Sequence, residues 1–334
     1  MALDLTTLAN SHRLLFKIPL KPLLGHRFQP TGFPGLGAAT FRTPDGDSLL
    51  VESVQSMANR MELTVWDGIN NDVIDAVKGI SHVRINSPKG DFLTDTILES
   101  HRLNSPYLLE ESSKKFFLQL REELSVSETG PIDRRKLAQV LLKYDVGSLL
   151  HGVFLAKKDL AGGRLRVARS MSGFIEADGV QVAASGGVKN DHVNPQGDAK
   201  IGFGNVPFAR DEFTAEKLTL YVNLDLAQIR GFGLDATVER MLVLLALYKL
   251  RALLDAGLRL RTACDLTVAT EQIQSLAPSA FVLPTLTAIE PDLKDAIGAC
   301  RSRMSVTETT YSDKIEAKGD SEKSDPDDAA TPED

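Results

Sequence analysis

The sequence predicts an α+β protein with a ferredoxin-like order of elements: strand, helix, strand, strand, helix, strand. Three observations carry this prediction. An apolar run over Arg13–Leu20 ends at prolines, as strands often do. From Glu52 the apolar residues recur every three to four positions, which is the spacing of a helix. Lys217–Leu224 alternates like a half-buried strand and precedes a long apolar helix, Ala236–Ala256, which Gly257 caps.

Shorter elements fill the order between these landmarks. A Gly- and Pro-rich loop is expected over Gly25–Gly37, then a hairpin of Ala38–Arg42 and Ser48–Val51. The helix from Glu52 to about Trp66 buries Val54, Met57, Met61 and Val65. Further strands are expected at His82–Ile85, Leu149–Leu155, Arg164–Glu176 and Leu258–Leu266. Helices are expected between Asp95 and Tyr144, with Pro131 in the first turn of Ile132–Tyr144, and over Pro291–Arg303. The segments 70–145 and 185–208, the second an irregular loop, are then insertions into one domain over 1–304.

Charge and composition narrow the class of protein. The 30 residues from Ser305 to Asp334 hold ten acidic residues and three lysines, so the body of the chain is neutral. We expect 305–334 to be a disordered acidic tail, because it has few large apolar residues. The two cysteines, Cys264 and Cys300, form no disulfide framework, and the longest apolar run is too short to cross a bilayer. The prediction is a cytoplasmic protein without membrane partners.

The polar face of the helix in Val51–Glu62 is the first candidate binding surface. With Ser53 as N-cap, the residues off the apolar stripe are Gln55, Ser56, Asn59 and Arg60. Hydroxyl and amide groups at a helix N-terminus hold phosphate oxygens without reading sequence. An ordinary amphipathic helix with a serine cap has the same pattern, so the residues alone leave both interpretations open.

Seven segments in order resemble one family of RNA-holding proteins. They are Val51–Glu62, His151–Phe154, Ser172–Ala177, Ser185–Asp191, Gly202–Phe208, Asn223–Gly231 and Leu258–Asp265. The first, with Ser-x-Gln-Ser followed by Asn-Arg, is similar to the signature of CRISPR backbone subunits. The set resembles the type I-G (formerly I-U) Csb-type backbone subunit of the Cascade surveillance complex, in the RAMP superfamily. The matched blocks lie between about Ala38 and Leu266.

This resemblance implies a fold and a set of partners. The fold is a modified RNA-recognition palm, and an extended thumb on each protomer kinks the guide at intervals. The implied partners are guide crRNA, further copies of the chain, the large subunit, the guide-processing and end-capping subunit, and the target DNA strand. The implied role is a non-catalytic backbone that forms a helical oligomer in antiviral defence.

Basic residues in three further segments are candidate RNA contacts. Lys157–Arg169 has five basic residues against Asp159 alone, and Arg164 and Arg166 share one strand face, with Arg169 beyond them. A solvated edge hairpin explains that segment equally well. Arg259 and Arg261 share a face of the last strand, and Arg230 precedes Gly231. Salt bridges within the protein are an equal alternative for these arginines.

The glycine-rich loop is assigned to RNA mainly on the resemblance. Lys189 and Asn190 supply donors beside glycines that permit close approach, and Phe203 can stack on a base. Phe208, after Pro207, is expected to anchor the loop to the core.

Enzyme and metal chemistry find little support in the sequence. The spacing of a metal site is absent from the histidines His101, His151 and His192. The glycines of Gly32–Gly37 have the wrong spacing for dinucleotide binding. We therefore predict no catalytic residue, metal or cofactor. The alternative is a metal-dependent RNA endonuclease of the type III backbone kind, with Asp191 or Asp91, in a possible thumb over Ser87–Asp95, as its carboxylate. A small-molecule enzyme on the same fold has no paired catalytic groups behind it.

Overall fold

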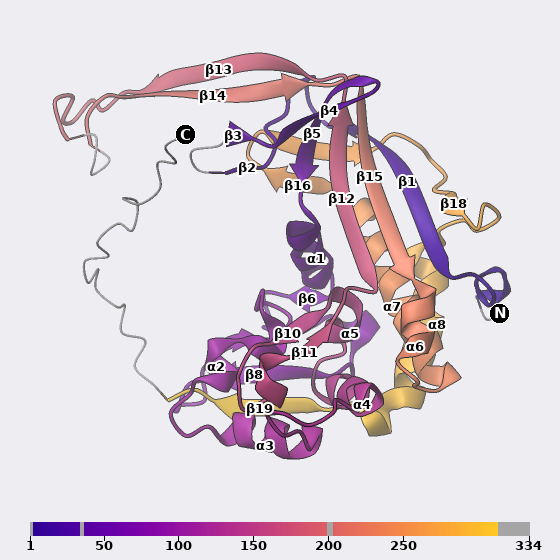
Figure 1. Ribbon diagram of the computed structural model, residues 1–334. Helices are drawn as coiled ribbons and strands as arrows, with labels where there is room; N and C mark the ends of the chain where they lie inside the picture. Colours follow the sequence, from indigo (N-terminus) through magenta and orange to yellow (C-terminus); the bar gives the residue numbers. More distant parts are fainter. Residues whose placement is uncertain (1–2, 34–36, 199–202, 313–334) are drawn as a thin grey trace, which may run out of the picture.

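The protein has an α+β fold built on an eight-stranded antiparallel sheet (Figure 1). The computed structural model describes residues 3–33, 37–198 and 203–312. Along the main sheet the strands are β16 (Leu258–Arg261), β17 (Cys264–Val268), β1 (Arg13–Pro22), β15 (Lys217–Asp225), β12 (Met171–Asp178), β5 (Gly46–Glu52) and β4 (Thr40–Thr43), and β18 (Ser275–Ala277) also pairs with β1.

Alternation along the central strands gives the sheet one apolar face. In β1 the even-numbered residues from Leu14 to Leu20 are buried, and the odd-numbered ones lie on the other face. Phe16 of β1 lies opposite Val222 of β15, which in turn lies opposite Gly173 of β12. The register therefore aligns the buried positions of all three strands.

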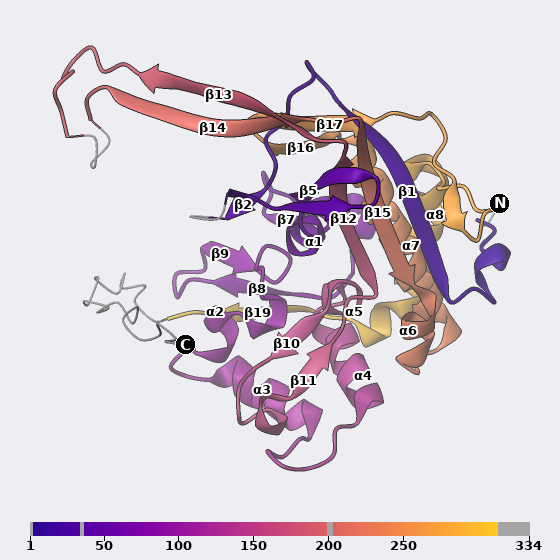
Figure 2. The ribbon, with the colours of Figure 1, turned by 45° about the horizontal axis from the view of Figure 1, so that its top comes forward.

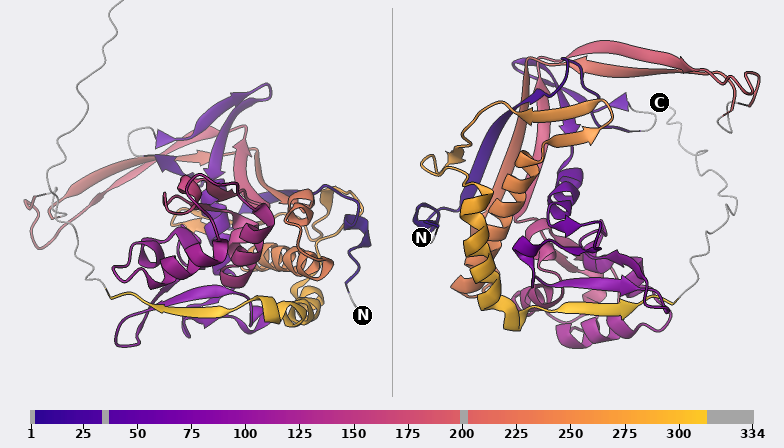
Figure 3. Two further views of the ribbon diagram at one scale, coloured as in Figure 1. Left: turned by 60° about the horizontal axis from the view of Figure 1, so that its bottom comes forward. Right: turned by 180° about the vertical axis from the view of Figure 1, so that it is seen from behind.

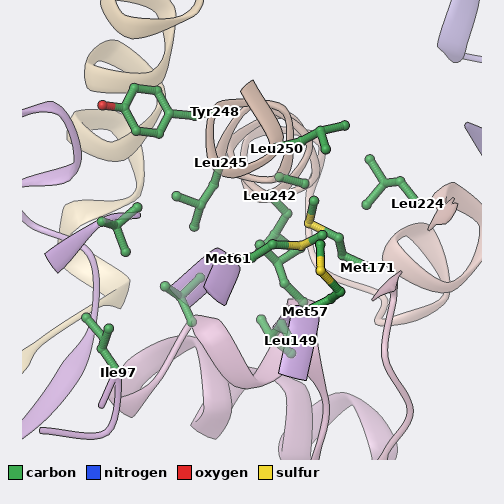
Figure 4. Close-up of a cluster of buried hydrophobic side chains, with 14 of the residues drawn as sticks. Met57, Met61, Ile97, Leu149, Met171, Leu224, Leu242, Leu245, Tyr248 and Leu250 are labelled. Atoms are coloured by element: carbon green, nitrogen blue, oxygen red, sulfur yellow. The ribbon is translucent and has the colours of Figure 1, made fainter. Parts of the chain in front are cut away.

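Helices α1 (Val54–Leu63), α7 (Ala236–Asp255) and α8 (Leu286–Cys300) pack beside this sheet (Figures 1 and 3). Met57 and Met61 of α1 are fully buried, and Figure 4 shows them against Leu242 of α7. Met57 and Met61 belong to the apolar stripe that the sequence predicted for α1. Gly257 at φ +79° ends α7, as the sequence predicted.

A second group of elements forms a lower lobe in the view of Figure 1. A three-stranded sheet of β19 (Val306–Thr310), β8 (His82–Asn86) and β9 (Phe92–Asp95) lies beside helices α2 (Pro106–Leu109), α3 (Lys115–Leu124), α4 (Arg134–Tyr144) and α5 (Gly147–His151). The chain also has short two-stranded ribbons: β6 (Trp66–Asp67) with β7 (Asp72–Val73), β10 (Val153–Leu155) with β11 (Leu165–Val167), and β2 (Gly32–Phe33) with β3 (Gly37–Ala38). Helix α6 (Leu226–Gly231) precedes α7.

A long β-ribbon projects from the body (Figure 2). It consists of β13 (Gln181–Lys189) and β14 (Val206–Thr214), which pair antiparallel over their whole length. We call it the arm. The sequence predicted an irregular loop over 185–208. The structure places 185–189 and 206–208 in the two strands, and the described residues between them lie outside any strand. Phe208, expected to anchor a loop to the core, is 52% exposed on the arm.

Several other boundaries differ from those expected. The segment 164–176 forms two strands, β11 and β12, in different sheets, and the expected strand 258–266 is the hairpin of β16 and β17. His151 and the residues before it form α5 instead of a strand. Asp133 caps α4 through the Lys136 N–H, so Pro131 precedes that helix. Thr285 caps α8, which places Pro291 inside it.

The start of the expected tail also differs from the prediction. Residues 306–310 form β19 and pair parallel with β8, and Tyr311 packs edge-on against Tyr107 at 5.0 Å between ring centroids. The remainder of the expected tail, 313–334, lies outside the described residues. Of the helices in the described residues, none combines the length and apolarity needed to cross a bilayer.

Candidate nucleic-acid interface

A basic groove of about 730 Å³ lies where α1 meets the lower lobe. Its charged lining is entirely cationic among the described residues: Arg102, Arg134, Arg166 and Arg169, with His101 and His151 beside them. We call this cavity the groove. A cavity lined by arginines and by no described acidic residue attracts polyanions, although the body of the chain is neutral overall.

The N-terminal turn of α1 forms one wall of the groove. The side chain of Ser53 accepts the Ser56 N–H at 3.2 Å, which confirms Ser53 as the N-cap. Because Met57 and Met61 face α7, Gln55 faces away from the core and lines the groove. Gln55 Nε2 donates to Asn59 Oδ1 at 3.2 Å, and Arg169 donates to Gln55 Oε1. The predicted polar face of α1 thus borders the groove.

The ribbon of β10 and β11 forms another wall. Phe154 and Arg166 lie directly opposite each other in the register, and their neighbours Leu155 and Leu165 are buried. The Arg166 guanidinium lies 4.7 Å from the Phe154 ring centroid, and the ring is 47% exposed. A cation and an exposed ring side by side suit a phosphate and an unpaired base.

Buried charged groups lie beneath the floor of the groove. Glu62 Oε2 accepts from Lys249 Nζ at 2.8 Å, and Glu62 Oε1 lies 3.4 Å from Arg102 Nε. Burial alone raises the pKa of Glu62, but Lys249, His151 and Arg102 outweigh it and lower this pKa to about 2. Glu62 is therefore ionised and holds Lys249 and Arg102 in place.

Three polar atoms at this floor lack a hydrogen-bond partner: Arg102 Nη2, Arg169 Nε and His151 Nδ1. Burial, and then the charge of Lys249, hold the pKa of His151 well below its usual value. Burial and the charge of Arg102 likewise lower the pKa of Arg169. Arg102 and Arg169 thus lie close together beside the neutral ring of His151, each with a polar atom that lacks a partner.

The groove continues past Arg134 and Arg166 into a hollow of about 280 Å³ beside α6. Gln228 and Phe232 line this hollow, and Gln228 Nε2 donates to the Ala168 carbonyl at 2.6 Å. Arginines and aromatic rings therefore recur along a path from α1 to α6, which is the composition of a single-strand binding track.

Two predicted arginines have partners inside the protein. Arg60 donates to the carbonyls of Arg259 and Leu260, at 3.2 and 2.5 Å, and joins α1 to β16. Arg261 donates to the Gln29 carbonyl at 2.7 Å and to the buried carboxylate of Glu52. The ion pair of Arg261 with Glu52 is the internal salt bridge that the sequence left open for Arg261. The RNA contacts of Arg60 and Arg261 stay predictions.

The remaining predicted residues are dispersed. Arg164 donates to the carbonyls of Ala161, Glu128 and Gly130, and Arg230 donates to the Ser11 carbonyl at 2.6 Å. Arg259 is exposed on β16. Lys189, Asn190 and Phe203 lie near the tip of the arm, and Phe203 is 54% exposed (Figure 1). The structure thus gathers Gln55, Arg166 and Arg169 at the groove and leaves the other predicted side chains elsewhere.

Sequence reasoning missed Arg102, Arg134 and Phe154 as lining residues and rejected His151 only as a metal ligand. Arg102 and Arg134 lie in the expected insertion, where nothing in the local pattern separates a groove residue from a surface one. Phe154 and His151 lie in His151–Phe154, one of the seven segments that resemble the RNA-holding family. That resemblance was the signal that could have identified them.

The carboxylates of the endonuclease alternative have local roles. Asp191 accepts the N–H groups of Val193, Asn194 and Gly204, and these bonds keep its pKa below the usual value. Asp91 closes the turn between β8 and β9 with Ser87. In the described ranges, no group of three His, Cys, Asp or Glu side chains is arranged to hold a metal ion.

Comparisons with known proteins identify one family. Residues 14–182 match the family described as CRISPR-associated protein GSU0053. No curated protein matches the chain. Among solved structures, the chain is similar to one described as a CRISPR RNA-guided surveillance complex, pre-nicking, at 15% identity and a TM-score of 0.37 over 87% of this chain and 88% of that chain. It is also similar to Csc2 of Thermofilum pendens, at 8% identity and a TM-score of 0.29 over 89% and 77%. These two likenesses are distant, and the family match alone carries the assignment.

Proposed function

Because the chain belongs to the family of CRISPR-associated protein GSU0053, we propose that it binds guide RNA in the groove as a non-catalytic backbone subunit. The observation that carries the proposal is the lining of four arginines and an exposed phenylalanine, without a described acidic residue. Arginines neutralise phosphates irrespective of sequence, and the ring of Phe154 offers a face for an unpaired base. Membership of a type I-G Cascade complex that targets DNA is part of the same proposal.

The order of elements supports a ferredoxin-like palm. Helix α1 lies between β1 and β12 in the chain, and α7 lies between β15 and the β16–β17 hairpin. The four strands β17, β1, β15 and β12 are neighbours in that order at the centre of the sheet. This order supports the proposal of a strand–helix–strand repeat like that of RNA-recognition folds, with an extra hairpin, β4 and β5, at one edge.

The arm supports self-assembly along the RNA. It is a two-stranded ribbon whose side chains include the exposed apolar residues Val182, Val188 and Phe208. Two strands alone do not bury such residues, so a ribbon of this kind gains stability by contact with another surface. We assign the arm as the thumb that reaches the next copy of the chain and the RNA between them.

RNA binding by the groove is tested by its salt dependence. The full chain is titrated against a labelled, unstructured 40-nucleotide RNA between 50 and 300 mM KCl, and the slope of log Kd against log salt is measured by anisotropy. Each lost phosphate contact lowers a single-strand slope by about 0.7, so Arg134→Ala with Arg166→Ala lowers it by about 1.4. Lys294→Ala, on α8 outside the groove, is the matched control and leaves the slope unchanged.

Two results contradict the proposal: no RNA binding at the lowest salt, or a double variant with the wild-type slope. Guide identity is tested separately, by sequencing RNA that co-purifies with the chain and the products of neighbouring genes. A constant segment shared by the bound RNAs is expected, and RNAs without one contradict the guide assignment.

A further inference from the structure

Two of the three unpartnered atoms at the floor of the groove belong to side chains that are almost wholly buried. Arg102 is 4% exposed and His151 is 1% exposed, yet both line the groove. Arg102 Nη2, His151 Nδ1 and Arg169 Nε have no hydrogen-bond partner. Buried polar groups are almost always paired, so three orphans in one cavity indicate a missing ligand.

The hydrogen bonds of His151 determine which of its nitrogens donates. Lys249 Nζ lies 3.3 Å from His151 Nε2, and an ammonium group can only donate, so Nε2 accepts. The low pKa of His151, caused by burial and then by Lys249, keeps the imidazole neutral. A neutral ring whose Nε2 accepts carries its proton on Nδ1. All three orphaned atoms are therefore N–H donors.

The charges that surround these donors leave room for an anion. Glu62 of α1 already binds Lys249 of α7 and Arg102. Asp145, before α5, accepts from Ser148 at 2.6 Å, and burial followed by the charge of Glu62 raises its pKa to about 6. Arg134 of α4, His101 and Arg169 add cationic or neutral groups at the rim. With Arg134 and Arg169 of the rim counted, four cations surround two carboxylates, so the site favours an anion over a metal ion.

The backbone conformation of Arg102 sets the position of its guanidinium group. Its φ of +50° lies in the left-handed region, which a long side chain such as arginine rarely adopts. This conformation brings its Nε near Glu62 and its Nη1 to 3.5 Å from the Gly152 carbonyl, while Nη2 is left over.

We propose that the floor of the groove binds one phosphoryl oxyanion through the N–H donors of Arg102, His151 and Arg169. The three nitrogens are shielded from solvent, so the oxyanion reaches them by displacing the contact between Arg169 and Gln55. A tetrahedral phosphoryl group offers an oxygen to each of three donors, whereas a planar carboxylate has two oxygens. The inference deepens the proposed function and rests on it for RNA as the source of the phosphate.

The test uses inorganic phosphate on the full chain. Phosphate replaces KCl at constant ionic strength, and Tm is followed by scanning fluorimetry, with acetate as the carboxylate comparison. We expect a saturating rise in Tm with phosphate and none with acetate. Arg169→Lys keeps the charge but removes the Nε–H, and it is expected to weaken phosphate binding at least tenfold. The control Lys294→Ala removes a cation on α8 outside the groove, and it is expected to change phosphate affinity less than twofold.

Three results overturn the inference: no rise beyond that in KCl, an equal rise with acetate, or an equal loss in Lys294→Ala. Normal phosphate binding by Arg169→Lys overturns the assigned donor, and Arg169→Gln repeats the test if the lysine variant is unstable.

RNA offers two sources of the phosphoryl group: a 5′-terminal phosphate and an internal phosphodiester. A comparison of RNA with a 5′-phosphate and RNA with a 5′-hydroxyl distinguishes them. Tighter binding of the phosphorylated RNA by wild type alone assigns the terminal group. Equal binding of both RNAs, weakened by Arg169→Lys, assigns an internal phosphodiester. RNA binding without any response to phosphate contradicts this inference and leaves the proposed function in place. A rise in Tm with phosphate but no binding of RNA contradicts the proposed function and leaves the anion site in place.

Discussion

Glu62 shows how one residue acquires its role from distant parts of the chain. Its partners Arg102, His151 and Lys249 come from η3 (Arg102–Asn104), α5 and α7. A Cβ at position 147 would lie 2.5 Å from Glu62 Oε1, so the chain passes the carboxylate at a glycine. The folded pKa of Glu62 is about 2 against 4.5 ordinarily, so its stabilising effect is present above pH 4.5 and is lost as the pH falls toward 2. The periodicity of α1 could not reveal this network, because the partners are set by tertiary packing.

Asp145 gives the opposite pH dependence. Burial, and then the charge of Glu62, raise the pKa of Asp145 from 3.8 to about 6. The ionised carboxylate therefore destabilises the folded protein. This destabilisation disappears as the pH falls through 6 toward 3.8. Asp145→Asn is expected to stabilise the protein by about 1–3 kcal/mol at pH 8 and by about half as much at pH 5. Urea unfolding at both pH values measures the difference.

The matched control for this prediction is Asp255→Asn, on the exposed pair with Arg251, which should show the same small effect at both pH values. An Asp145→Asn variant less stable than wild type at pH 8, or equally stabilised at pH 5, would contradict the assignment.

At the scale of elements, strong periodicity was predictable and ribbon geometry was not. β1, α1, β15 and α7 follow from their patterns because each buries one face or stripe. The arm was predicted as a loop because Gly186 and Gly187 interrupt it and because most of its residues are exposed, so no polar–apolar alternation marks β13. The hairpin of β16 and β17 was predicted as one strand because its turn, Thr262-Ala263, carries no glycine or proline.

The arm is expected to act in assembly and not in folding. Val188→Ser with Phe208→Ser changes two exposed side chains and should alter the free energy of unfolding by less than about 0.5 kcal/mol per site. The same variant should bind RNA but lose the ladder of multiple copies on a 40-nucleotide strand, measured by mass photometry.

Leu118→Ser is the control for the arm variant, because Leu118 is equally exposed, at 52%, but lies on α3. Wild-type assembly by the arm variant, or lost assembly in Leu118→Ser, would show that the arm does not join the copies.

The whole molecule brings together segments that its sequence keeps apart. A net charge of −7 conceals a neutral body and, within that body, a groove without a described acidic lining residue. The sequence supported RNA binding through single segments, and three of its fourteen predicted residues line the groove. The other lining residues could not be predicted, because the groove exists only where α1, β10, β11 and the lower lobe meet.

The contact of β19 with β8 is expected to stabilise the lower lobe. Comparing a chain that ends at Ser312 with one that ends at Met304 isolates the strand. The shorter chain loses the backbone bonds of β19 and the ring contact of Tyr311 with Tyr107, and it should be less stable by about 2–5 kcal/mol. Chemical unfolding of both chains measures this loss, and equal stability would contradict the structural role of β19.

The pairing of β19 with β8 has a consequence during synthesis, because β19 is translated long after β8. Asn86 of β8 donates to Glu308 of β19, which lies 222 positions later in the chain. At about 5–20 residues per second, a ribosome takes about 10–45 s to make the chain between them. Throughout that interval one edge of β8 has no strand to pair with, and an unpaired edge can recruit a neighbouring nascent chain. When many ribosomes translate one message, this wait is the period in which the protein is most exposed to aggregation.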